Sequence, residues 1–86
     1  MATTEIPTRS QMIRTLQRNH CQVKFRKSDG TTRTALATLI EDEVPYYEGK
    51  PGGDNREVIA YYDLERYSWR SFRVDAVKNF KVLPRD

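Results

Sequence analysis

Apolar and polar residues alternate with a period of two in several short stretches of this chain. Cys21, Val23 and Phe25 alternate with polar residues, which is the pattern of a half-buried strand. Residues 28–30, Ser-Asp-Gly, then supply a tight turn, and we expect a second strand over residues 31–40. The inward face of that second strand stays open, because apolar residues occupy both of its faces.

A helical pattern precedes these strands, and further strands follow them. Thr8 and Gln11 have the spacing of a capping box, so we expect a helix over residues 8–19. Its apolar side chains fall on one side of the helix: they are Met12, Ile13 and Leu16. Later strands are predicted at residues 57–63, at residues 69–74 and, after a short break at residues 75–77, in the segment that carries Phe80 and Val82 and ends at Pro84.

Residues 41–56 interrupt the strand pattern. They are acidic at first and then rich in proline and glycine, which is typical of a loop. We therefore expect a long mobile loop here, which is unusual in a small domain. It is either a functional element or an insertion tolerated at small entropic cost.

One helix and five short strands predict a mainly β fold. We expect a small SH3-like five-stranded barrel with an N-terminal α-helix and a long loop after the second strand, because barrel closure removes exposed sheet edges. An OB-like barrel is the alternative, but it needs longer strands and a helix in mid-chain. We assign residues 1–7 to a flexible N-terminus and residues 8–86 to a single domain.

The net charge of +3 hides a division along the sequence. Residues 8–33 contain seven basic side chains and one acidic side chain, whereas residues 41–57 contain six acidic and two basic side chains. The segment after Tyr61 carries six basic and four acidic residues. A basic face can attract phosphate, although the same charges can simply solvate a small domain.

Little in the chain points to catalysis, a cofactor or a metal. Cys21 is the only cysteine, so there is no disulfide or zinc spacing, and a reducing intracellular setting fits best. Side chains of neighbours such as His20 and Cys21 diverge, which excludes a catalytic dyad. The acids at 41–43 lack further cation ligands, and Gly52-Gly53 is not a phosphate loop. No signal or bilayer-spanning segment is evident.

Two segments carry a family resemblance. Tyr62-Asp63-Leu64 and the later W-R-S-F-R-V-D at residues 69–75 resemble the pattern of WYL domains, SH3-like modules associated with bacterial transcription regulators and defence systems. This resemblance covers the C-terminal third. The order of segments from residue 21 to residue 77 is also similar to a family of small phage proteins of SH3 β-barrel fold. The likeness implies a bacteriophage origin and action in the cytoplasm of a bacterial host.

WYL domains sense nucleic acid or nucleotide-like ligands through basic and aromatic residues, and the resemblance implies the same here. The chain departs from the pattern at Ala76-Val77, where WYL domains carry Arg-Ile. Trp69 and Phe72 lie on opposite faces of a regular strand, so one of them is expected to be exposed. The candidate nucleic-acid or ligand-binding residues are Arg70, Arg73, Trp69, Phe72, Tyr62, Lys24 and Arg26.

The acidic loop supports a different hypothesis, a protein-binding inhibitor or adaptor that targets a host enzyme or defence complex. Tyrosines are common in interface hot spots, and an acidic loop can steer toward a basic groove on a partner. The candidate contacts are Tyr46, Tyr47, Glu41, Glu43 and Tyr67. The expected partner is therefore host nucleic acid or a nucleic-acid-associated bacterial protein, and the oligomeric state is left open.

Overall fold

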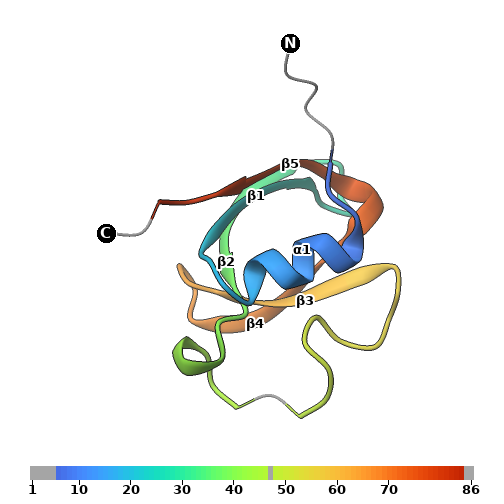
Figure 1. Ribbon diagram of the computed structural model, residues 1–86. Coiled ribbons are helices and arrows are strands. Elements are labelled where there is room, and N and C mark those ends of the chain that lie inside the picture. Colours follow the sequence, from blue (N-terminus) through green and yellow to red (C-terminus); the bar gives the residue numbers. More distant parts are fainter. Residues whose placement is uncertain (1–5, 47, 85–86) are drawn as a thin grey trace.

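The computed structural model describes residues 6–46 and 48–84. Its elements are α1 (Arg9–Leu16), β1 (Cys21–Arg26), β2 (Thr32–Thr38), the 3-10 helix η1 (Glu41–Glu43), β3 (Val58–Asp63), β4 (Ser68–Arg73), the 3-10 helix η2 (Val74–Ala76) and β5 (Val77–Val82). The strands form one antiparallel sheet in the order β4-β3-β2-β1-β5, which curls around the core with α1 across one opening (Figure 1). The predicted mainly β fold with an N-terminal helix and a long loop after the second strand is confirmed.

Helix α1 begins as its sequence predicts. The Thr8 hydroxyl accepts a hydrogen bond from the Gln11 N–H, and the Gln11 side chain accepts one from the Thr8 N–H. The helix ends at Leu16, three residues before the predicted end, because the Leu16 carbonyl accepts from the Leu39 N–H instead of a helical donor. Leu16 is fully buried, which fixes the helix against the sheet. None of the helices in the described part of the chain is long and apolar enough to cross a membrane.

The pairing of β1 with β2 settles which face of β2 is inward. Val23 lies opposite Ala35, and Cys21 lies opposite Ala37. Residues directly opposite in an antiparallel pair share a face, so both alanines point into the core. All four side chains are buried.

The aromatic core forms where β1 meets β3 and β4. The Phe72 ring lies 5.4 Å from the ring centroids of both Phe25 and Tyr61. Phe72 is only 3% exposed, whereas Trp69 is half-buried and packs edge-on against Tyr62. Of the two aromatic side chains on β4, Phe72 therefore belongs to the core and Trp69 is the more exposed.

The loop between β2 and β3 is attached to the barrel at its second half. The Arg9 guanidinium donates hydrogen bonds to the carbonyls of Gly52, Gly53 and Val58. The Gly52 carbonyl also accepts from the Ala60 N–H at 2.9 Å. Arg9 therefore has a structural role, although the sequence showed it only as one of the basic residues in the segment 8–33.

Gly52 packs directly against helix α1. Its φ of +81° is unfavourable for residues with a side chain, and a Cβ at this position would lie 2.5 Å from Ile13 Cδ1. The loop can approach the helix this closely only because position 52 carries no side chain.

Candidate nucleic-acid interface

An open pocket of about 450 Å³ lies between the β1–β2 hairpin and the β3–β4 hairpin. Strand β2 pairs with β3 only at Ala37–Asp63 and Thr38–Tyr62, so the first half of β2 follows β1 and separates from β3. The pocket occupies this separation. Its cationic lining residues are Arg26, Lys27, Arg33, Arg66, Arg70 and Arg73, and its other lining residues are Phe25, Ser28, Tyr61, Ser71 and Phe72. We call it the cationic pocket.

Asp63 fixes the Arg33 side chain and the backbone of the turn that carries Arg66. Its Oδ2 atom accepts a hydrogen bond of 2.6 Å from Arg33 Nη2, and its Oδ1 atom accepts from the N–H groups of Glu65 and Arg66. Burial opposes ionisation of Asp63, but these backbone donors and the Arg33 guanidinium outweigh it, so the pKa of Asp63 lies below its usual value. One buried carboxylate thus positions Arg33 and the hairpin turn that carries Arg66.

Arg70 and Arg73 differ in the charges around them. Arg73 donates to both carboxylate oxygens of Asp75 at 3.0 and 3.1 Å and has Glu57 3.6 Å away, and the hydrogen bond to Asp75 raises the pKa of Arg73. Arg70 lies opposite Tyr61 in the strand register and forms no ion pair within residues 6–46 and 48–84. Arg70 is therefore the more available of the two for an anionic ligand.

Tyr61 contributes a polar group to the floor of the cationic pocket. Its side chain is 1% exposed, and burial raises the pKa of Tyr61, while the nearby charges of Arg33, Arg70 and Arg66 act in the opposite direction. Within the described residues its hydroxyl has no hydrogen-bond partner, although it lies in the field of three guanidinium groups. The hydroxyl is thus a potential donor to an anion in the pocket.

The cationic pocket gathers four of the residues selected from the sequence: Arg26, Arg70, Phe72 and Arg73. The structure places the other three elsewhere. Trp69 and Tyr62 pack together on the opposite face of the sheet from Phe72, and Lys24 lies on the exposed face of β1 and does not line the pocket.

Sequence reasoning missed seven lining residues of the pocket, and the four of these that carry a charge or a phenol group are Lys27, Arg33, Tyr61 and Arg66. One signal was present for Tyr61, because it alternates with Ile59 and Asp63 along β3 and therefore shares their buried face. Arg33 meets Asp63 only through tertiary folding, and no local pattern indicates that contact.

A comparison with known protein families finds one that matches this architecture. A family model described as WYL_2, Sm-like SH3 beta-barrel fold, matches residues 9–78. The chain belongs to the WYL_2 family. The match runs from α1 into β5, so the expectation that the WYL likeness is confined to the C-terminal third was wrong. No curated protein and no solved structure gave a match.

The same WYL_2 barrel carries a second open groove, of about 510 Å³, on the other side of β4. It lies between the acidic loop and Trp69, and its lining residues are Gln17, Leu39, Glu41, Asp42, Val44, Pro45, Tyr46, Gly49, Pro51 and Trp69. We call it the acidic groove. The two sites share no lining residue.

Two of the described residues that were predicted as protein contacts lie outside the lining of the acidic groove. Glu43 pairs with His20 at the helix–strand junction. Tyr67 is 77% exposed in the β3–β4 turn, where its φ is +51°. Tyr47 lies outside the described residues. Of the predicted contacts, Glu41 and Tyr46 line the groove.

Cys21 and His20, which were considered for catalysis, are held by packing or by an ion pair within the fold. Cys21 is fully buried, and burial raises the pKa of its thiol to about 11, so it stays protonated at neutral pH. His20 contacts the Glu43 carboxylate. Among the described residues, no three His, Cys, Asp or Glu side chains gather as metal ligands would. What the two sites offer chemically is charge and apolar surface.

Proposed function

We propose that this protein is a non-catalytic nucleic-acid-binding module that receives the phosphate backbone of a short single strand in its cationic pocket. The observation that carries the proposal is that six cationic residues line one pocket, with no acid among its lining residues in the described chain. Phosphate contacts of this kind supply most of the affinity of nucleic-acid binding. Membership of the WYL_2 family supports a nucleic-acid-related regulatory role.

The pocket residues contribute to phosphate binding in different ways. Arg70 supplies a charge that no described carboxylate neutralises, whereas Arg33 supplies one that Asp63 holds in a fixed position. Tyr61 also lines the pocket, and its hydroxyl adds a neutral donor. No Asp, Glu, His or Cys side chain lines the pocket among the described residues, which favours binding over phosphodiester cleavage.

We place this activity in the cytoplasm of a bacterial host, as a phage-type module that acts on host nucleic acid or on its transcription or defence machinery. The resemblance of residues 21–77 to small phage barrel proteins supports this setting. A pull-down from bacterial lysate, with and without nuclease, separates the two targets. Partners lost after nuclease indicate nucleic acid, and a retained protein indicates the machinery itself.

The proposal predicts that Arg70→Ala weakens binding of a fluorescein-labelled single-stranded oligonucleotide, measured by anisotropy. Each phosphate contact contributes about 0.7 to the salt slope of single-strand binding, so the variant should lose about that much slope and about fivefold in affinity at about 50 mM salt. Lys24→Ala is the matched control, since it removes the same charge from the exposed face of β1. It should change the affinity less than about twofold.

Two outcomes would contradict the proposal. One is an oligonucleotide that fails to bind the parent protein at low salt. The other is an equal loss from Arg70→Ala and Lys24→Ala, which would mean that only the overall charge matters. Tyr61→Phe gives a finer measurement, because it keeps the ring that packs on Phe72 and removes only the hydroxyl. We expect it to weaken binding without changing the salt slope.

A further inference from the structure

The acidic groove is a second site whose chemistry differs from that of the cationic pocket. We propose that it binds an extended, arginine-bearing peptide segment of a partner protein. The proposal is independent of nucleic-acid binding, because the two sites have no lining residue in common. The sequence of the acidic loop suggested a contact with a partner protein, and the proposal gives that contact a location and a ligand class.

The walls of the groove are apolar. Leu39 is buried at its base, and Trp69 and Val44 are half-buried beside it. Pro45 and Pro51 add rigid apolar surface from the loop. Surfaces of this kind accept the aliphatic stem of a long side chain, while its charged end stays near water.

The charges at the groove are of one sign. Glu41 and Asp42 both line it, and no lysine or arginine is among its lining residues in the described chain. Neither carboxylate forms an ion pair within residues 6–46 and 48–84; the neighbouring Glu43, outside the lining, is the one that pairs with His20. A guanidinium group complements this arrangement because it can bind two carboxylate oxygens at once. The same carboxylates repel a phosphate backbone.

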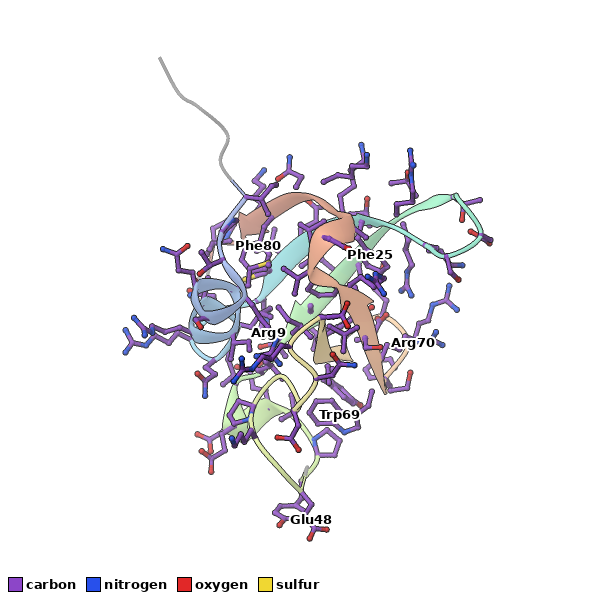
Figure 2. The ribbon with its side chains drawn as sticks, turned by 90° about the vertical axis from the view of Figure 1, so that its right-hand side faces the viewer. Arg9, Phe25, Glu48, Trp69, Arg70 and Phe80 are labelled. Atoms are coloured by element: carbon purple, nitrogen blue, oxygen red, sulfur yellow. The ribbon has the colours of Figure 1, made fainter. Side chains whose placement is uncertain are left out.

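The groove is supported on both sides. The turn that carries its acids is closed by a hydrogen bond from the Glu43 N–H to the Ile40 carbonyl. The opposite limb of the loop is attached through Arg9 to β3, and Trp69 packs on Tyr62. Figure 2 shows the Trp69 ring on the side of the loop that carries Glu48, away from Arg70. A preformed groove loses less entropy when a ligand binds.

Tyr46 marks the mouth of the groove. It is 89% exposed and lines the groove, so its ring is accessible to a ligand bound there. Tyrosine is one of the residue types enriched in interface hot spots. We expect Tyr46 to pack on the bound peptide.

The test measures anisotropy of a fluorescein-labelled peptide in which arginine alternates with leucine, and of the same peptide with citrulline in place of arginine. Citrulline keeps the shape of the side chain and removes its charge. The E41Q/D42N variant should weaken binding of the arginine peptide by about tenfold. E48Q/D54N removes two exposed acids of the same loop outside the groove, so it should weaken binding by less than about twofold.

Tyr46→Ala should also weaken binding, and its control Tyr67→Ala should not, because both tyrosines are exposed but only Tyr46 lines the groove. Circular dichroism and thermal unfolding verify that every variant is folded. The proposal is overturned by equal losses in the two acid variants, by equal binding of the citrulline peptide, or by an arginine peptide that does not bind. It is also overturned if sedimentation shows a self-association that E41Q/D42N abolishes, since the occupant would then be a second copy.

Discussion

A single carboxylate, that of Asp63, joins the stability of the barrel to the geometry of the cationic pocket. It is fully buried and accepts hydrogen bonds from one guanidinium and two backbone N–H groups. Because its pKa is lowered in the folded state, its ionisation stabilises the fold at pH values above the ordinary pKa of 3.8. That contribution is lost as the pH falls from this value through the lower folded value.

We therefore predict that the free energy of unfolding falls as the pH is lowered from about 5 to about 2, and that Asp63→Asn reduces this dependence. At neutral pH the variant should lose about 3 kcal/mol, since Arg33 would remain mostly buried without its counter-charge. Urea unfolding at several pH values provides the measurement. Asp29 and Asp75 also have lowered pKa values and leave a smaller residual dependence. An unchanged pH profile in the variant would contradict this role for Asp63.

At the scale of elements, α1 and the acidic loop stabilise each other although they are far apart in sequence. The Arg9 side chain reaches the carbonyls of Gly52, Gly53 and Val58, and in Figure 2 it lies between the helix and the loop. Hydrogen bonds from a charged donor contribute more to stability than hydrogen bonds between neutral groups. The helix thus fixes one wall of the acidic groove.

Arg9→Ala should destabilise the protein by about 2 kcal/mol and speed amide hydrogen exchange between residues 48 and 60. Hydrogen exchange followed by mass spectrometry measures the second effect. Arg14→Ala is the control, because Arg14 lies exposed on the same helix. If the loop exchanged equally fast in both variants, the Arg9 contacts would not be what attaches it.

These elements show what the sequence could and could not predict. The start of α1 was predictable because Thr8 and Gln11 satisfy each other locally, and β1 was predictable because its alternation is strict. The inward face of β2 was not, since only its pairing with Cys21 and Val23 distinguishes two apolar faces. The cationic pocket needed tertiary contacts, such as that between Arg33 and Asp63, which no local pattern encodes.

For the whole molecule, a small net charge of +3 conceals two sites of opposite charge on either side of β4. Trp69 and Arg70 are neighbours in sequence, and a strand directs consecutive side chains to opposite faces. Trp69 therefore lines the acidic groove, and Arg70 lines the cationic pocket. Strand β4 contributes to both sites, so it can bring two binding partners of opposite charge close together.

This arrangement predicts that the two binding events are energetically separate. Arg70→Ala should leave the affinity for the arginine peptide unchanged, and E41Q/D42N should leave oligonucleotide binding unchanged or slightly stronger. Combined in one protein, the changes should add within about 0.5 kcal/mol for each ligand. Anisotropy titrations of the three variants measure this. A larger coupling would mean that both ligands use one continuous surface.

The lack of a side chain at Gly52 has a consequence for how this protein can diversify. Because Gly52 fits against Ile13, the loop has a fixed point where it returns to the barrel. Substitutions or insertions between residues 44 and 50 fall before that point, where loop-closure entropy rises only slowly with length. Such changes can alter the recognition properties of the groove while the barrel and its cationic pocket keep their structure.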